Sequence, residues 1–181
     1  MNVLAPKPCR KKLKSLLFKK RIFKNFYQHH ISLHEQGITM RICGVELTGN
    51  DAVICLLNLE GQQFNIPDCR VRKLSLPKEH SRDDLKQFQI AFAQLMRDYK
   101  VDKVAIKGRL PKGKFAGGAV SFKLEAAIQL LADIEVILLS SSQAKAALAD
   151  NPLHIPFADT ELKGFQEAAF ITAYVAHHSN A

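Results

Sequence analysis

Five short segments of the chain have the apolar or alternating pattern that predicts β-strands. These segments are residues 41–48, 52–59, 70–76, 102–107 and 134–139. The first two flank Gly49 and Asn50, and a glycine followed by an asparagine between two such segments favours a tight hairpin. The segment 70–76 alternates between apolar and polar residues, as an edge strand with one solvated face does. We therefore expect three antiparallel strands at the start of the domain.

Apolar residues at helical spacing separate the later strands. After Ser81, which forms a capping-box pattern with Asp84, one apolar stripe continues to Tyr99. Further helices are expected at residues 120–132, 142–149 and 159–177. Strands that are joined by helices run parallel through right-handed crossovers. The pattern therefore predicts an α/β domain with a five-stranded mixed sheet, three antiparallel strands followed by parallel strands, and helices on both faces.

Positive charge is concentrated in the first part of the chain. Residues 1–39 hold nine Lys and Arg residues and one acid, Glu35, whereas residues 40–181 hold 17 basic and 16 acidic residues. Nearly all of the net charge of +9 therefore belongs to residues 1–39. The charge favours a polyanionic partner only if this segment takes part in binding.

Residues 1–39 are expected to be a basic N-terminal extension of a domain that spans residues 40–181. One alternative is a disordered arm, and another is a mis-assigned start, with the natural protein beginning at Met40. Apolar residues among the lysines also fit an amphipathic helix that could lie on anionic lipid or on a phosphate backbone.

The rest of the composition is typical of a cytoplasmic protein with one hydrophobic core. No apolar run reaches the roughly 20 residues of a membrane-spanning helix, and no secretory signal is present. The four cysteines include no C-x-x-C pair, which predicts reduced thiols and argues against a zinc knuckle.

Three short motifs follow one another in an informative order. They are Gly44-Val45-Glu46 in the first strand, SQAK at residues 142–145, and QEAAFITA at residues 166–173. Together with the order of elements, they resemble the ribonuclease-H-like superfamily, and within it the RuvC-type Holliday-junction resolvases, over most of residues 41–178. The stretches IKGR (106–109) and KGKFAGGAVSFKLEAA (112–127) also resemble a bacterial family classified as a domain of unknown function. This second resemblance implies a fold but no activity.

The resemblance to the resolvases implies that Glu46 occupies the position of a metal-binding carboxylate. A two-metal nuclease needs carboxylates from separate elements to converge on two Mg²⁺ ions about 3.5–4 Å apart. An acid within a central strand is costly unless it is paired or binds metal. Where the resolvases have a second glutamate, however, this chain has Lys107. We expect Glu46 and Lys107 to form an ion pair there; the alternative is that Lys107 extends outward and leaves Glu46 free for a single weak ion.

The remaining acidic candidates belong to the predicted last helix. Glu167 lies in the stretch that matches the resolvases, while Asp159 and Glu161 lie at the expected helix start, where acids also complement the helix dipole. Glu46 and Glu167 are therefore the candidate metal ligands. Glu46, Glu167 and Asp159 are the candidate catalytic residues.

Basic candidates are grouped in the glycine-rich loop 108–118. Arg109, Lys112 and Lys114 accompany backbone amides before a helix, which suits a phosphate group, although the Walker A ending is absent. The alternative is a solvated, mobile loop. With Lys107 and Lys145, these three residues form the predicted ligand-binding set.

Three functions remain open. The favoured one is a ribonuclease-H-like domain with altered catalytic carboxylates that binds nucleic acid or another phosphate-bearing ligand. The second is a metal-dependent nuclease or resolvase-like phosphodiesterase, and only this function would require Mg²⁺ or Mn²⁺. The third is a protein-interaction module. Whether the protein is an enzyme depends on the surroundings of Glu46.

Overall fold

The computed structural model describes residues 39–60, 63–114 and 116–179. The predicted extension lies outside the described residues except for Thr39, so the boundary at residue 40 stays a prediction. No helix in the part of the chain that the structure describes is long and apolar enough to cross a membrane.

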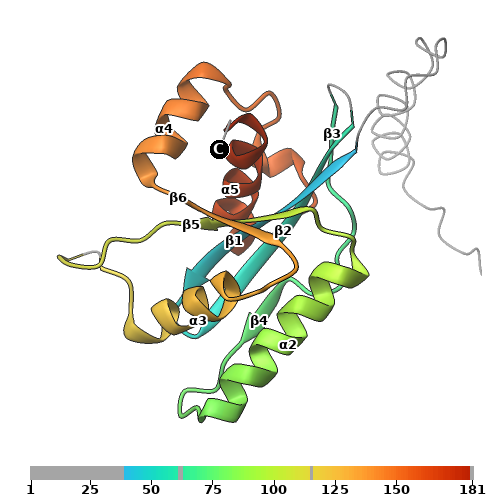
Figure 1. Ribbon diagram of the computed structural model, residues 1–181. Helices are drawn as coiled ribbons and strands as arrows, with labels where there is room; N and C mark the ends of the chain where they lie inside the picture. Colours follow the sequence, from blue (N-terminus) through green and yellow to red (C-terminus); the bar gives the residue numbers. More distant parts are fainter. Residues whose placement is uncertain (1–38, 61–62, 115, 180–181) are drawn as a thin grey trace, which may run out of the picture. The chain divides into compact units, whose positions relative to one another are not determined.

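A mixed sheet forms the centre of the domain (Figure 1). The predicted hairpin is present as β1 (Met40–Thr48) and β2 (Asp51–Glu60), and Gly49 adopts the positive φ of 56° that its turn requires. On the other side of β1, β5 (Lys103–Lys107) and β6 (Glu135–Leu139) run parallel to it. The strand order is β3-β2-β1-β5-β6, with β4 paired to the opposite end of β2 from β3.

The prediction of a single third strand at residues 70–76 was wrong in its extent. Two short strands, β3 (Gln63–Asn65) and β4 (Lys73–Ser75), pair with opposite ends of β2, so that the described sheet has six strands. The connection between them contains Pro67, which has no N–H to donate to a ladder. The carbonyl of Ile54, between the two pairing regions, accepts a hydrogen bond from the side chain of Gln166 instead.

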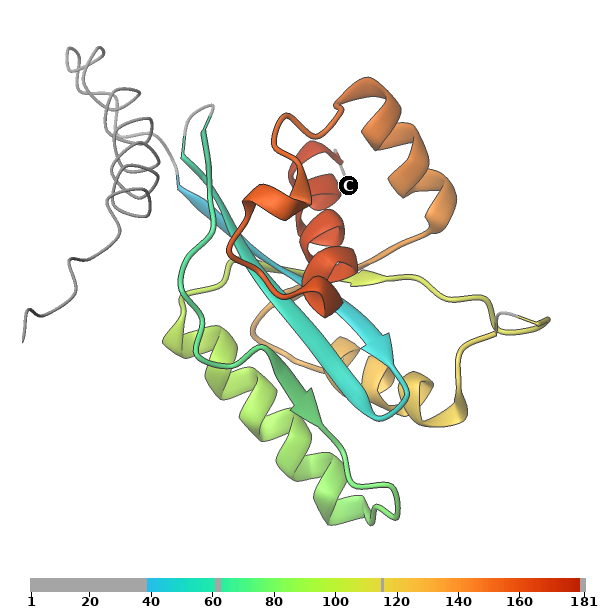
Figure 2. The same cartoon turned by 180° about the vertical axis from the view of Figure 1, so that it is seen from behind.

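Helices cover both faces of the sheet, as predicted (Figures 1 and 2). One face is covered by α2 (Arg82–Asp98) and α3 (Ala119–Gln129), and the other by α4 (Ser141–Asp150) and α5 (Glu167–His178). The capping box between Ser81 and Asp84 is confirmed. A second one, between Ser140 and Gln143, begins α4 directly after β6.

The last helix begins later than its sequence pattern predicts. Residues expected in its first turns form two 3₁₀ turns instead, η1 (Phe157–Asp159) and η2 (Gly164–Gln166), and α5 starts at Glu167. The hydroxyl of Thr160 donates to the carbonyl of Phe157 and closes η1. Phe157 and Leu162 pack against the core beside α5, so their apolar character reflects this packing and not a continuous helix.

Gly44 allows β1 and α5 to approach each other unusually closely. A Cβ atom at residue 44 would overlap the carbonyl oxygen of Ala169 and would lie 2.6 Å from the backbone nitrogen of Ala173. The alanines of α5 and this glycine therefore bring the helix backbone against the strand. This contact fixes α5 on the sheet face that also carries Glu46.

Two histidines at the end of α5 pack against β2 and β3. A ring nitrogen of His177 bonds the carbonyl of Leu57 at 3.0 Å, so Nε2 carries the proton, and the rings of His177 and His178 both pack against Phe64. Burial lowers the pKa of His177 below its ordinary value of 6.5, with the nearby His178 adding to the effect against the opposing hydrogen bond to Leu57. Burial and His154 lower the pKa of His178 in the same way.

We expect the free energy of unfolding to fall as the pH is lowered from 6.5 toward the depressed pKa values of the folded protein. Well above pH 6.5 both histidines are neutral in the folded and unfolded states, whereas near and below pH 6.5 the unfolded chain binds protons that the folded chain excludes. Denaturant titrations at pH 7.5 and 5.5 measure this loss. The variant His177→Gln should lose less than the wild type over this interval, and an equal loss would contradict the assignment.

Candidate functional site

Glu46 and Lys107 form the centre of the candidate site. The carboxylate of Glu46 lies 2.8 Å from Nζ of Lys107, and the two side chains are 25% and 45% exposed. The ion pair predicted from the sequence is therefore confirmed. The Glu46 side chain is the more buried of the two, whereas nearly half of the Lys107 side chain is accessible to solvent.

Sheet register explains why these two residues meet. Val45 and Ile106 are paired in the parallel ladder of β1 and β5, and Glu46 and Lys107 follow them at the carboxyl ends of the two strands. Gly44 of β1 and Ala105 of β5 precede the pair by two residues and face α5, so the site lies on the α5 side of the sheet.

This donor set does not fit a divalent cation. Within the described residues, no three His, Cys, Asp or Glu side chains come together in a way that could hold a metal. On β5, the position beside Glu46 that would have to supply a second carboxylate holds the Lys107 ammonium instead. A divalent ion about 4 Å from this ammonium would be repelled by several kcal/mol even at an effective dielectric constant of about 20. The Lys107 ammonium is therefore the counterion of the Glu46 carboxylate.

The other acidic candidates are separated from one another. Glu167 is exposed in the first turn of α5. Because Gln166 reaches Ile54, the partner of Val45, this end of α5 lies near the carboxyl end of β1. Asp159 lies in η1, and Glu161 is exposed between the two 3₁₀ turns, so neither occupies the helix start assigned to it from the sequence. Catalytic or metal-binding roles for Glu167 and Asp159 stay predictions.

The base of the loop 108–118 is built around a buried ion pair that the sequence did not reveal. Arg109 Nη2 lies 2.5 Å from a carboxylate oxygen of Glu125, and the two side chains are only 11% and 16% exposed. Two other guanidinium nitrogens of Arg109, Nε and Nη1, are buried without a hydrogen-bond partner among the described residues. The guanidinium also lies 4.6 Å from the centre of the Phe122 ring, and this cation–π contact offsets part of the cost of burying them. Removing one partner of a buried pair typically costs about 3–5 kcal/mol.

Close backbone contacts also hold the two ends of the loop together. Gly117 donates its N–H to the carbonyl of Leu110 at 3.0 Å and packs against the Phe122 ring and the Arg109 side chain. Gly108 packs against the carbonyl of Leu139, where a Cβ atom would lie 2.9 Å away. The loop therefore leaves the carboxyl end of β5 on a fixed base, next to Lys107.

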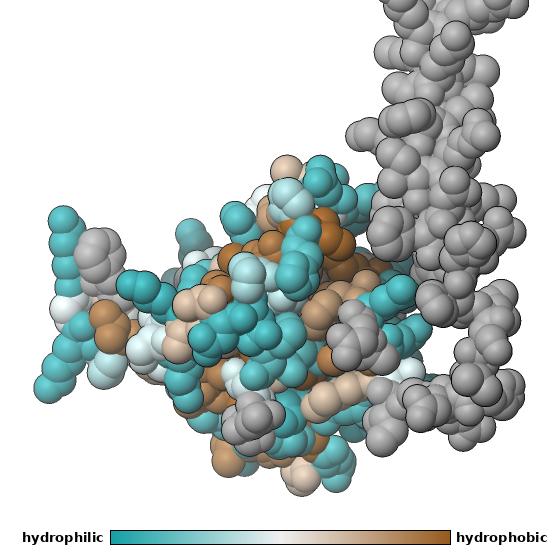
Figure 3. Space-filling view, turned by 90° about the horizontal axis from the view of Figure 1, so that it is seen from above, coloured by the Kyte–Doolittle hydropathy of each residue, from teal (hydrophilic) through white to brown (hydrophobic). Residues whose placement is uncertain are grey.

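Lysines occupy the outer part of this loop. Lys112 and Lys114 are exposed on either side of Gly113, whose φ is 99°. Seen from above, the loop projects from the domain and its end is largely hydrophilic (Figure 3). Lys145 is exposed on α4, which begins directly after β6. The structure thus places Lys107, Lys112 and Lys145 on elements that leave the same edge of the sheet, whereas Arg109 is occupied at the loop base.

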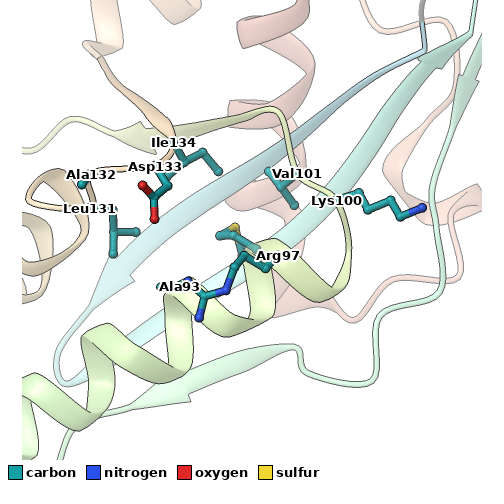
Figure 4. Close-up of a pocket in the computed structure, with 9 residues that line it drawn as sticks. Ala93, Arg97, Lys100, Val101, Leu131, Ala132, Asp133 and Ile134 are labelled. Atoms are coloured by element: carbon teal, nitrogen blue, oxygen red, sulfur yellow. The ribbon is translucent and has the colours of Figure 1, made fainter.

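A shallow cavity of about 110 Å³ lies elsewhere, at the amino ends of β5 and β6 (Figure 4). Its floor is apolar, with Met96, Val101 and Leu131 among the lining residues, and Arg97, Lys100 and Asp133 lie at its rim. Lys107 ends β5 at the opposite end of the strand, so this cavity takes no part in the site.

Comparisons with known proteins agree with this architecture. A family model described as "Protein of unknown function (DUF3010)" matches residues 40–176. No curated protein matches the chain. Among solved structures, Thermus thermophilus RuvC is similar with a TM-score of 0.60 and 14% identity, covering 77% of this chain and 94% of that chain. The structure of T. thermophilus RuvC in complex with Holliday junction substrate is similar with a TM-score of 0.58 and 13% identity, covering 77% of this chain and 93% of that chain. The predicted ribonuclease-H-like fold is confirmed, and at these identities the similarity concerns the fold alone.

Proposed function

Because this chain belongs to the DUF3010 family, with a ribonuclease-H-like fold and a lysine at the second carboxylate position, we propose that it binds nucleic acid without metal-dependent cleavage. The observation that carries the proposal is the Glu46–Lys107 ion pair. It removes the cation-binding capacity of the central carboxylate and at the same time presents an ammonium group where the sheet ends.

The similarity in fold is the reason for proposing nucleic acid as the partner. The RuvC structure with the same fold is in complex with a Holliday junction substrate, a branched nucleic acid. In this protein, Lys107 is 45% exposed, and Lys112, Lys114 and Lys145 are exposed on the neighbouring loop and helix. These lysines are the proposed phosphate contacts, because ammonium groups that neutralise phosphates release counterions and favour binding.

Arg109 has a different part in this proposal. Its guanidinium is bound to Glu125 and stacked on Phe122. We therefore assign it to positioning the loop that carries Lys112 and not to direct contact with a phosphate.

Salt-dependent binding tests the proposal. We would measure the anisotropy of a fluorescent branched DNA with the full chain at several salt concentrations and compare it with Lys112→Ala/Lys145→Ala. Each lost phosphate contact should reduce the slope of log K against log salt by about 0.9, so this variant should lose about two units. The matched control Lys78→Ala/Lys86→Ala removes two exposed lysines on the α2 side of the domain and should leave the slope unchanged.

Two results would oppose the proposal. Equal slopes for the two double variants would remove these lysines from the interface. Absence of binding to both DNA and RNA would leave the protein-interaction module as the better interpretation of the fold.

A further inference from the structure

Phe165 is an aromatic side chain held in solvent beside the candidate site. Several large apolar side chains are exposed in the described part of the chain, and Phe165, at 50%, is the aromatic one among them. It lies in η2, immediately before α5. A phenyl ring that is left half in water forgoes part of its burial free energy, so an exposed ring next to a candidate site is a candidate contact.

Gln166 fixes the turn that carries this ring. The Gln166 side chain is buried, its amide donates to the carbonyl of Ile54 at 2.9 Å, and its carbonyl oxygen accepts from the N–H of Lys163 at 3.2 Å. A backbone hydrogen bond of 2.8 Å from Gln166 to Lys163 closes the same turn. Because Gln166 ties the turn to β2 and also closes residues 163–166 through two hydrogen bonds with Lys163, the backbone that carries Phe165 has little conformational entropy left to lose on binding.

The anchoring point also locates the ring relative to Lys107. Ile54 pairs with Val45 in the β1–β2 ladder, one residue before Glu46. The helix α5 follows Gln166 directly and covers the face of the sheet that carries Gly44 and, two residues later, Glu46. The turn therefore lies at the same end and on the same face as the Glu46–Lys107 pair.

The neighbours of Phe165 indicate what kind of surface it would contact. Its neighbours in sequence, Lys163, Gly164 and Glu167, are all exposed, so charged groups and bare backbone flank Phe165 along the chain. A protein partner's hot spot is usually enclosed by a water-excluding rim and is poorly matched here. A nucleobase fits better, since it offers a flat π-face to the ring and polar edges and a phosphate to the flanking groups.

We infer that Phe165 is a stacking platform for an unpaired nucleobase, which makes nucleic acid with single-stranded or branched segments the substrate class of the site. The inference rests on the proposed nucleic-acid binding. A continuous duplex keeps its bases stacked on one another and offers no free face, whereas an unpaired base does. In this arrangement, Lys107 and Lys163 lie beside the sugar–phosphate backbone of the bound nucleic acid. Stacking on the aromatic ring then gives the preference for unpaired segments.

The lack of tryptophan in this chain allows a direct test. In the full-length variant Phe165→Trp, the introduced indole is the single tryptophan, and stacking of a base on it quenches its emission. We expect saturable quenching by a single-stranded oligonucleotide and little quenching by a blunt duplex of equal length. The matched reporter Ile90→Trp places an indole at a site that is 56% exposed on α2, across the sheet, and should respond to neither.

Affinity measurements with unlabelled variants complete the test. Phe165→Leu should weaken single-strand binding by about tenfold and leave duplex binding unchanged, whereas Phe165→Tyr should retain wild-type affinity. If the single strand binds while Phe165→Trp is not quenched and Phe165→Leu binds like wild type, the stacking platform is refuted and the proposed function stands. If wild type binds neither nucleic acid, the proposed function fails and the platform fails with it.

Discussion

Replacing Gly44 with alanine should destabilise the domain by about 3 kcal/mol or more. The added methyl group meets backbone atoms of Ala169 and Ala173, which cannot move aside as a flexible side chain could. Relief requires α5 to shift away from β1, and this would disrupt packing on one whole face of the sheet. Chemical denaturation followed by circular dichroism measures the change.

A second glycine provides the control for this experiment. Gly164 has no atom within 4 Å of an added Cβ and no positive φ, so Gly164→Ala should change the free energy of unfolding by less than about 0.5 kcal/mol. If Gly44→Ala were as stable as Gly164→Ala, the close approach of α5 to β1 would be incorrect. The location assigned to Glu167 and Phe165 would then lose its basis.

The substitution Lys107→Glu should convert the ion pair into a carboxylate pair that binds a divalent cation. Without metal, two like charges would replace the attractive pair of Glu46 and Lys107, and the variant should be less stable than wild type by about 1–3 kcal/mol. With Mn²⁺, the carboxylates gain a shared counterion, and the free energy of unfolding should rise with the logarithm of the metal concentration once this exceeds Kd. We expect Mn²⁺ affinity at least about 100-fold above that of wild type, measured by calorimetry and by the shift in Tm.

Lys107→Gln separates the two effects of this substitution. It removes the ammonium without adding a carboxylate, so it should bind Mn²⁺ more weakly than Lys107→Glu. Tight Mn²⁺ binding by the wild type, equal to that of Lys107→Glu, would show that the Lys107 ammonium does not exclude the ion. The hypothesis of an occupied metal position would then be wrong.

Local signals explain the parts of the fold that the sequence predicted well. The capping box at Ser81, the hairpin turn at Gly49 and the apolar stripe of α2 each depend on residues within a few positions of one another. The predicted strands β1, β2, β5 and β6 agree with the structure to within one residue at each end. The pairing of Glu46 with Lys107 follows from strand order, because the two residues come directly after the last paired residues, Val45 and Ile106, of neighbouring parallel strands.

Features that depend on distant contacts escaped prediction. The late start of α5 reflects packing of Phe157 and Leu162 against the core, and helical spacing alone does not reveal this. The side chain of Gln166 donates a hydrogen bond to Ile54 of β2, more than a hundred residues earlier in the chain. Glu125 of the helix after the loop, α3, forms an ion pair with Arg109. No spacing rule connects the two residues of either pair. The sequence therefore predicted Arg109 as a ligand-binding residue and gave no sign of its ion pair with Glu125.

The most direct test of the proposed function is to incubate the wild-type protein with a labelled branched DNA and Mg²⁺ or Mn²⁺, following complex formation and strand integrity in the same samples. Binding without cleavage is the predicted result, with affinity falling as salt rises and independent of the divalent cation beyond its ionic strength. Metal-dependent cleavage that is abolished by Glu46→Gln would contradict it, because Glu46 would then be acting as a metal ligand despite Lys107.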